Sequence, residues 1–327
     1  MAFFHLEPYD PCPLAQTGAL DEPAADSQMV SLDIQSKYLF VDENGANYHE
    51  YFVPGAPDVQ NCGGYVDKVI QYRNPELLTY LSSRRFSPEA FAESSFPILK
   101  TRSPQLDLVL FALIEQLLEA RPEERVSLLD HGCTVAEHYD LLDAMLNASS
   151  GGARTAPNTL SYCGLDKSSM LLSIARMLLS KTEPEHFRLV RAEGSSFDFK
   201  AREFDLSLSV GVINHVAQPL EALKKLLSAT RVACVLAIWV TLEGDGFWAF
   251  NHSGVPNYFF SRDDLARLRD SRPGMRAFYT SFTPEMEASQ KRSYVGIGEA
   301  KTHLLGSYHL VFSTLANLPF EAQEVPL

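Results

Sequence analysis

Two acidic residues, each at the end of an apolar run, are the side chains of this sequence best placed to do chemistry. The first run, Val126-Ser-Leu-Leu-Asp-His-Gly-Cys-Thr-Val-Ala-Glu137, contains Asp130 and Gly132 where it ends. The second, Tyr162-Cys-Gly-Leu-Asp-Lys167, ends with Asp166. An α/β sheet binds a nucleoside cofactor through such an acid and glycine, followed by a second acid about one crossover unit later. The two turns therefore predict a nucleoside-cofactor site at one edge of a sheet.

Each turn has its own part in such a site. Gly132 lets the backbone pass close to a ligand, and a helix expected at 136–147 presents its N-terminal N–H groups beyond it. Asp166 is an acceptor-only side chain at a strand end, which suits ribose hydroxyls. Glu193 follows the next strand, and we expect it to receive an adenine amino group or a bridging water.

Alternating strand and helix patterns surround these turns. Buried strands are expected at 126–129, 160–165, 187–191, 204–210 and 232–240, with helices at 136–147, 167–180 and 218–229. Such a βαβ series predicts a parallel sheet. After residue 240, a short helix is expected to open at Ser261, and strands at 276–282 and 308–314 are expected to pair with each other.

The N-terminal part of the chain has a different pattern. Residues 1–30 are rich in Pro, Asp and Ala without periodicity, which predicts an arm. Residues 31–122 are expected to be mainly helical, with helices at 75–93 and 104–120 and a strand at 37–41. We interpret this region as a lid or a homodimer face that precedes a domain at 123–327.

The order of these segments resembles the class I S-adenosylmethionine-dependent methyltransferases over about residues 124–314. The resemblance is carried by Leu129-Asp-His-Gly-Cys133, by Gly164-Leu-Asp-Lys-Ser-Ser-Met-Leu171 and by Phe204-Asp-Leu-Ser-Leu-Ser-Val-Gly-Val-Ile-Asn-His-Val216. It implies an α/β, Rossmann-like fold, in which a seven-stranded sheet has helices on both faces and an antiparallel last strand pair. It also implies S-adenosyl-L-methionine as cofactor and in-line transfer of its sulfonium methyl group.

The resemblance further implies a set of cofactor contacts. Asp130 and Gly132 would border the methionine part of the cofactor, Asp166 the ribose, and Lys167 and Met170 the adenosine flank. The segment Glu193 to Ser195 would approach adenine, and Ser209 to Gly211 would line the floor beneath the sulfonium. The full expected set is Asp130, Gly132, Cys133, Asp166, Lys167, Met170, Glu193, Gly194, Ser195, Ser209, Val210 and Gly211.

One stretch departs from the family pattern. The family continues its first motif with two further glycines, whereas this chain has Thr134, Val135 and Ala136. These side chains leave the loop less freedom for positive φ and less room against a ligand. Either the cofactor sits slightly higher, or this copy has weakened or lost its binding.

Methyl transfer asks the protein mainly for proximity and alignment, because the cofactor is already activated. The candidate catalytic base is His215, and packing or hydrogen bonding near the crevice is an equally weighted alternative. Tyr65 lies in a segment that suits either a lid or a tight turn, and Trp248, His252 and Tyr258 lie in an aromatic-rich loop that would cover the acceptor or anchor to the surface. His215 and His252 have no third ligand at a recognisable spacing, so no metal is expected.

Composition narrows the classes of partner. The 327 residues carry a formal net charge of −13, which disfavours nucleic acid and anionic membranes. No export signal or membrane anchor is expected, and five cysteines without a CxxC pair indicate a reduced, cytoplasmic protein. We therefore expect the acceptor to be a small molecule, such as a carboxylate-bearing metabolite or a natural-product intermediate.

Two other functions compete with methyl transfer. A methyltransferase-like binding or scaffold protein with a degenerate cofactor pocket would explain the replaced glycines. A nicotinamide dehydrogenase fits less well, because the antiparallel C-terminal strand pair and the missing GxGxxG both oppose it.

Overall fold

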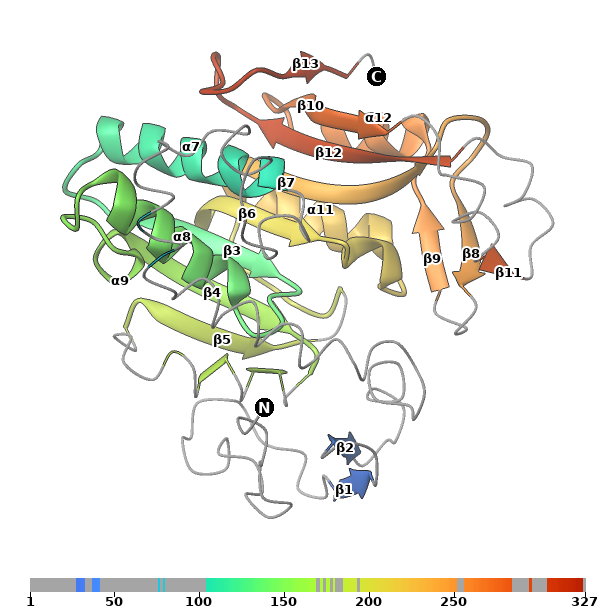
Figure 1. Ribbon diagram of the computed structural model, residues 1–327. Helices are drawn as coiled ribbons and strands as arrows, with labels where there is room; N and C mark the ends of the chain where they lie inside the picture. Colours follow the sequence, from blue (N-terminus) through green and yellow to red (C-terminus); the bar gives the residue numbers. More distant parts are fainter. Residues whose placement is uncertain are drawn as a thin grey trace.

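A mixed eight-stranded sheet forms the centre of the computed structural model (Figure 1). The structure describes residues 28–32, 37–41, 76, 79, 104–168, 171–172, 175–176, 179, 185–192, 195–251, 256–283, 294–295 and 305–325. The strand order is β13-β10-β12-β7-β6-β3-β4-β5. The strands are β3 (Val126–His131), β4 (Leu160–Asp166), β5 (Phe187–Arg191), β6 (Phe204–Val210), β7 (Thr230–Thr241), β10 (Arg276–Thr283), β12 (Leu305–Ser313) and β13 (Gln323–Glu324).

The strand pairing confirms the predicted sheet. Strands β3 to β7 pair in parallel, whereas β12 pairs antiparallel with both β7 and β10. The expected antiparallel C-terminal pair is therefore β10 with β12. The two-residue strand β13 extends the expected seven strands to eight by pairing with β10.

Helices cover both faces of this sheet, as predicted (Figure 1). They are α7 (Pro104–Ala120), α8 (Glu137–Ser149), α9 (Ala156–Thr159), α11 (Pro219–Ala229) and α12 (Arg262–Asp270), with a 3-10 turn, η1 (Ile213–His215). In the segment expected to be helical at 167–180, residues 171–172 and 175–176 are helical. Of the helix expected at 75–93, Glu76 and Thr79 are helical, and the rest lies outside the described residues.

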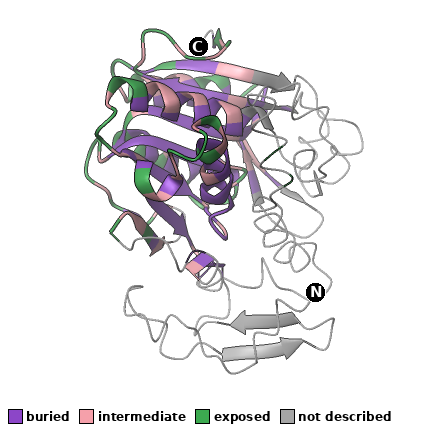
Figure 2. Cartoon of the chain, turned by 60° about the vertical axis from the view of Figure 1, so that its left-hand side comes forward, coloured by how far each residue is buried: buried purple, intermediate pink, exposed green. Residues whose placement is uncertain are grey.

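Two apolar layers, one on each face of the sheet, form the core. Along β7, Ala233 and Val235 join the cluster beneath α7 and α8, while Cys234 and Leu236 join the cluster beneath α11 and α12. This alternation follows from the two-residue period of a strand. The residues coloured as buried accordingly lie along the sheet and on the parts of the helices that face it (Figure 2).

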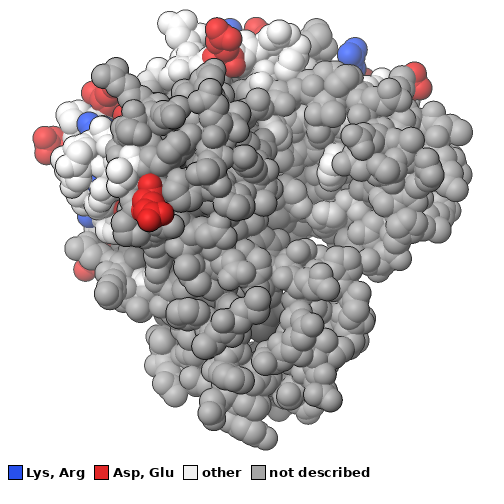
Figure 3. Space-filling model, viewed as in Figure 1, with Lys and Arg blue, Asp and Glu red and all other residues white. Residues whose placement is uncertain are grey.

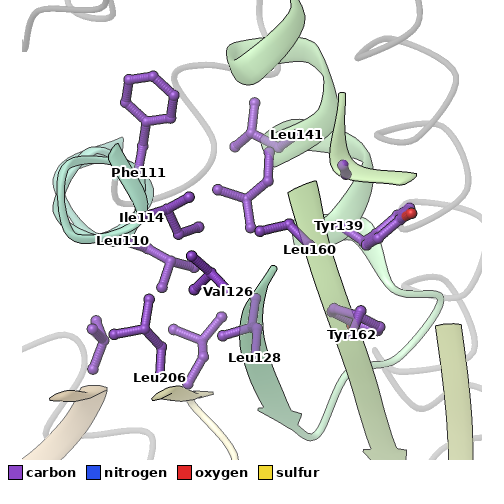
Figure 4. Close-up of a cluster of buried hydrophobic side chains, with 14 of the residues drawn as sticks. Leu110, Phe111, Ile114, Val126, Leu128, Tyr139, Leu141, Leu160, Tyr162 and Leu206 are labelled. Carbon is purple, nitrogen blue, oxygen red and sulfur yellow. The ribbon is translucent and has the colours of Figure 1, made fainter. Parts of the chain in front are cut away.

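Helix α7, which precedes the first motif, packs against the central sheet. It starts at Pro104, which suits the first turn of a helix because proline has no N–H to leave unpaired. Its side chains Leu110 and Ile114 face Val126 and Leu128 of β3 (Figure 4). The apolar stripe of α7 therefore packs on the same sheet that carries the predicted site.

Near the N-terminus, β1 (Gln28–Leu32) pairs antiparallel with β2 (Lys37–Val41). Strand β2 confirms the expected strand at 37–41. Strand β1 begins inside the segment that was expected to be an arm. Most of residues 1–103 lies outside the described residues, so the arm, the lid or dimer face, and the domain limits stay predictions.

The expected aromatic-rich loop after β7 is wrong for the described part of that segment. Strand β8 (Phe247–Asn251) pairs antiparallel with β9 (Pro256–Phe259), and β11 (Tyr294–Val295) pairs with β8. Cross-strand aromatic pairs hold this small sheet together, because the ring centroids of Phe247 and Phe259 lie 5.3 Å apart, as do those of Trp248 and Tyr258. Aromatic residues favour strands, which the prediction of a loop overlooked.

A buried carboxylate joins three elements at the amino edge of the sheet. Asp205, with a side chain 3% exposed, accepts hydrogen bonds from Arg121 at 3.0 Å and Arg231 at 3.2 Å. It also accepts hydrogen bonds from the N–H of Ser127 at 3.0 Å and from its hydroxyl at 2.9 Å. This cluster lies at the end of the sheet opposite the predicted site, so we assign it a structural role.

We expect Asp205→Ala to lower the free energy of unfolding by about 2–4 kcal/mol, because the variant leaves the two arginines and Ser127 without their common acceptor. Urea unfolding followed by circular dichroism measures the change. Asp270→Ala is the matched control, since Asp270 is 67% exposed in its ion pair with Arg269 and should contribute less than about 1 kcal/mol. Equal losses in the two variants would contradict the structural role of Asp205.

Candidate active site

The carboxyl ends of β3, β4 and β6 bring most of the described site residues together. In the sheet register, Asp130 is paired with Gly164 and His131 with Leu165 of β4, while His131 is also paired with Ser209 of β6. The acids of the two predicted turns thus end neighbouring parallel strands. Ligands of open α/β sheets bind at this edge.

The loop after β3 folds back onto β4. The N–H groups of Gly132 and Cys133 both donate to the carbonyl of Leu165, at 2.7 and 3.0 Å. Gly132 has φ 79°, and a Cβ built on it would lie 2.2 Å from Cγ2 of Val212. Glycine is therefore required here both by the backbone conformation and by the close approach of Val212.

Beyond Gly132, the loop keeps left-handed conformations even though the expected glycines are missing. Thr134 has φ 52° and Ala136 has φ 59°. Each of these non-glycine residues carries a strain of roughly 1–2 kcal/mol. The side chains at 134 and 136 have thus not prevented positive φ, and the fold instead bears the cost of it.

Asp166 ties this loop to the end of β4. Its Oδ2 accepts from the N–H of Thr134 at 3.0 Å, and its Oδ1 accepts from the N–H of Ser168 at 2.8 Å. Burial raises the pKa of Asp166 to about 6, while these hydrogen bonds and Lys167 oppose the shift. Because a carboxylate oxygen accepts about two hydrogen bonds, each oxygen can still receive a hydroxyl.

Asp130 is buried beside Asp166 and accepts a hydrogen bond from the hydroxyl of Tyr162 at 2.6 Å. Burial raises the pKa of Tyr162, and the charge of Asp130 raises it further, so this hydroxyl remains a donor. Cys133 is buried in the same region, and burial followed by Asp166 and Asp130 raises its pKa. Cys133 is therefore a neutral thiol rather than a nucleophile.

At the end of β6, Ser209 is fully buried, and its hydroxyl lies 3.1 Å from Nδ1 of His131. Val210 is half-buried, and Gly211 is exposed with φ 66°. A Cβ built on Gly211 would meet nothing within 4 Å. The open surface at this strand end therefore lies at Gly211, beyond the buried pair of Ser209 and His131.

The turn η1 carries two adjacent polar residues, Asn214 and His215, whose surroundings differ. His215 is exposed, whereas Asn214 is fully buried. The Asn214 amide donates to the carbonyls of Trp239, at 3.3 Å, and of Tyr258, and it accepts from the N–H of Trp239 at 3.3 Å. Asn214 thus joins η1 to β7 and to β9, a role that nothing in the sequence pattern indicated.

The loop after β5 is held by helix α11. Lys225 donates to the carbonyls of Ser195, at 2.8 Å, and of Phe197, at 3.1 Å. The hydroxyl of Ser195 lies 3.4 Å from the side-chain oxygen of Gln218. Lys167 accepts a hydrogen bond at its carbonyl from Arg191 at 3.4 Å. The remaining predicted residues Tyr65, Met170, Glu193, Gly194 and His252 lie outside the described residues.

The small sheet of β8 and β9 places Trp248 and Tyr258 on neighbouring strands beyond the end of β7 (Figure 1). Both side chains are half-buried. The hydroxyl of Tyr258 donates to Asp264 at 3.0 Å, and burial, together with that carboxylate, raises the pKa of Tyr258. A cavity of about 300 Å³ lies nearby, lined by Thr241, Leu242, Gly244, Asp245, Arg262 and Asp263.

The donor set at the carboxyl edge fits S-adenosylmethionine. Asp166 has acceptor capacity left for ribose hydroxyls, and Gly211 leaves open space at the end of β6. The residues that the structure describes contain no group of three metal-ligating side chains and no helix long and apolar enough to cross a membrane. On the described surface of the face in Figure 3, basic side chains do not gather into a patch.

Comparisons with known proteins bear on this geometry. Residues 146–237 match a family model described as a methyltransferase domain. No curated protein matches the chain. This match covers β4 to β6 and most of β7, which are the strands that form much of the predicted site.

Solved structures with a similar fold include YcgJ from Bacillus subtilis, with 10% identity, a TM-score of 0.41, and coverage of 63% of this chain and 99% of that one. A 1,6-didemethyltoxoflavin-N1-methyltransferase from Burkholderia thailandensis is 15% identical, with a TM-score of 0.36. The match covers 89% of this chain and 100% of that one. An arsenic(III) S-adenosylmethionine methyltransferase from Chlamydomonas reinhardtii is 13% identical, with a TM-score of 0.41. The match covers 60% of this chain and 65% of that one. Likenesses this distant transfer neither an acceptor nor a site residue.

The family match indicates S-adenosylmethionine as the methyl donor. The sheet has the parallel strands and the antiparallel C-terminal pair that the resemblance implied. Residues 146–237 are therefore similar to a methyltransferase domain, and the sheet around them has the class I methyltransferase-like strand arrangement that the resemblance implied.

Proposed function

We propose that this protein transfers the methyl group of S-adenosylmethionine to a small-molecule acceptor. The observation that carries the proposal is the loop after β3, which holds left-handed conformations at Gly132, Thr134 and Ala136 and is tied to Asp166. Strained backbone persists where the surrounding structure enforces it, and it concentrates at ligand sites. The positive φ at Thr134 and Ala136, kept without the expected glycines, therefore supports a loop that binds a ligand.

The cofactor would lie along the carboxyl edge of the sheet and would supply an activated methyl group. Asp166 would accept the ribose hydroxyls through its two remaining acceptor positions, and Gly132 would let the backbone approach the methionine part. We assign the remaining contacts as follows: Asp130 and Cys133 at the methionine part, Lys167 and Met170 at the adenosine flank, Glu193, Gly194 and Ser195 at adenine, and Ser209, Val210 and Gly211 beneath the sulfonium.

The chain's own chemistry would concern the acceptor. His215 is exposed on η1 at this edge, where it could take a proton from an acidic nucleophile. Its neighbour Asn214 is anchored to β7 and β9, which fixes the turn that carries His215. We assign His215 as the base, and Tyr65, Trp248, His252 and Tyr258 as the acceptor-binding residues.

Charge and composition support the acceptor class and the setting. A net charge of −13 opposes binding of nucleic acid or anionic membranes, so a small molecule is the favoured acceptor. The buried thiols Cys133, Cys163 and Cys234 are free, in keeping with a reducing cytoplasm. A homodimer through the N-terminal region remains part of the proposal.

Isothermal titration with S-adenosylhomocysteine tests the proposal directly. We expect saturable binding with one site per chain. A folded protein that releases or absorbs no heat at millimolar ligand would contradict methyl transfer. Circular dichroism on the same sample establishes that the protein is folded.

A methyltransferase-like binding or scaffold protein is the second candidate, and one contact favours it. Val212 fills the space beside Gly132, so the protein itself occupies part of the volume near the methionine end. If this packing excludes the cofactor, Val212→Ala should create binding that the unmodified protein lacks. Equal binding by the two proteins would argue against the scaffold.

A further inference from the structure

Thr134 combines two unfavourable features in one residue. It is a β-branched residue with φ 52°, a conformation that is rare for such side chains because the branched Cβ is crowded. Its hydroxyl is buried and has no hydrogen-bond partner in the structure. A buried polar group without a partner costs free energy, and one in a native site calls for an explanation such as a ligand.

The position of Thr134 limits what that ligand group can be. Its N–H donates to Asp166, the proposed ribose acceptor, at 3.0 Å. Helix α8 begins three residues later at Glu137, and its first turn also carries the acid Asp140. A helix N-terminus attracts an anion, but the two acids in this turn repel an anion that has no positive charge beside it. A zwitterion, which brings an ammonium together with a carboxylate, satisfies both conditions.

We propose that the Thr134 hydroxyl donates a hydrogen bond to the carboxylate at the amino-acid end of the cofactor. The inference rests on the proposed function, because that cofactor carries an α-amino acid next to its ribose. Where the family has a glycine, this chain would then have gained a hydrogen-bond donor in Thr134. The backbone strain at Thr134 would be the cost of holding that donor in place.

The test compares two ligands that share adenosine and a thioether sulfur. S-adenosylhomocysteine carries the amino-acid end, and 5′-methylthioadenosine lacks it. Thr134→Val keeps the shape and the strain of the side chain but removes the hydroxyl. We expect this variant to bind S-adenosylhomocysteine about tenfold more weakly in isothermal titration, and methylthioadenosine within about twofold of the unmodified protein.

Two further variants separate the hydroxyl from the backbone. Thr134→Ser keeps the donor, so it should bind S-adenosylhomocysteine within about threefold of the unmodified protein. Thr134→Gly relieves the strain without supplying a donor, so its loss should match that of Thr134→Val. Without ligand, Thr134→Val should melt at the same temperature as the unmodified protein or higher, since it buries no unpartnered hydroxyl.

Three outcomes would overturn the inference. Unchanged binding of S-adenosylhomocysteine by Thr134→Val would show that the hydroxyl is not used. An equal loss of both ligands in that variant would assign Thr134 to loop shape alone. If the unmodified protein binds neither ligand, the proposed function fails and this inference fails with it; if it binds both and only the Thr134 pattern is absent, the proposed function stands.

Discussion

Gly132→Ala is expected to lower the free energy of unfolding by roughly 2–5 kcal/mol, the largest effect of any single methyl group added to this site. Two causes add. An alanine at φ 79° is strained, and its Cβ would lie 2.2 Å from Cγ2 of Val212, 2.7 Å from Cγ1 and 2.8 Å from Cβ. Relief requires the turn after β6 to move, which would also move His215. Urea unfolding monitored by circular dichroism gives the change in midpoint and slope.

Gly211→Ala is the matched control for the backbone part of this effect. Gly211 has φ 66°, and a Cβ there would meet nothing within 4 Å, so the loss should be only about 1–2 kcal/mol. The clash can be isolated with Val212→Gly, because Gly132→Ala should cost less in that background than in the unmodified protein. If Gly132→Ala costs no more than Gly211→Ala, the close approach of Val212 is not a constraint on the folded protein.

The contrast between these glycines shows which parts of the site the sequence could predict. The strands that end at Asp130 and Asp166 follow from apolar runs and βαβ spacing, and the sheet confirms them. The close approach of Val212 to Gly132 could not be predicted, because it joins residues from two strand ends through packing alone. The pattern around residues 134–136 indicated a loop with less positive φ, and the structure shows that tertiary contacts override that local preference.

Contacts between distant segments limited the prediction in the same way elsewhere. Asn214 bonds to Trp239 and Tyr258, and no spacing rule connects residues 25 and 44 positions away. Asp205 likewise gathers arginines from two other elements. The aromatic segment after β7 contains several residues that favour strands, and weighing this preference would have predicted β8 and β9.

Asp166→Asn is expected to weaken S-adenosylhomocysteine binding at pH 7.5 by about 10- to 100-fold, the largest effect on binding that we predict. The carboxylate accepts one N–H on each oxygen and would accept ribose hydroxyls on the same oxygens. An amide has only one acceptor oxygen, and its NH2 group would face one of the two backbone N–H groups that Asp166 accepts from. The variant should therefore weaken both the backbone hydrogen bonds and the contacts to the ribose hydroxyls. Asp263→Asn, on exposed surface at the start of α12, is the control and should bind as the unmodified protein does.

The same carboxyl should make binding depend on pH. Its pKa is raised to about 6, so the ionised acceptor is largely lost at pH 5 and present at pH 7.5. S-adenosylhomocysteine should therefore bind the unmodified protein about tenfold more weakly at pH 5 than at pH 7.5. Asp166→Asn has no such group, so its affinity should vary less between the two pH values. Parallel pH profiles for the two proteins would show that Asp166 does not contact the ligand.

Asp166 should make the stability of the ligand-free protein fall as the pH rises, whereas it makes the affinity for S-adenosylhomocysteine rise. Because the folded pKa lies above the ordinary value of 3.8, the folded protein keeps this proton between pH 3.8 and about 6 while the unfolded chain loses it. The contribution of Asp166 is thus most favourable below pH 3.8, falls as the pH rises through that window, and is a cost on the order of 2–3 kcal/mol above it. Melting temperatures of the unmodified protein and of Asp166→Asn, compared at pH 4.5 and pH 7, isolate this group from the other carboxyls. We expect the affinity for S-adenosylhomocysteine to rise with pH, and the stability of the unmodified protein relative to Asp166→Asn to fall over the same range. Together these results would mean that the protein accepts a loss of stability from a buried charge at the position where its ligand needs a hydrogen-bond acceptor.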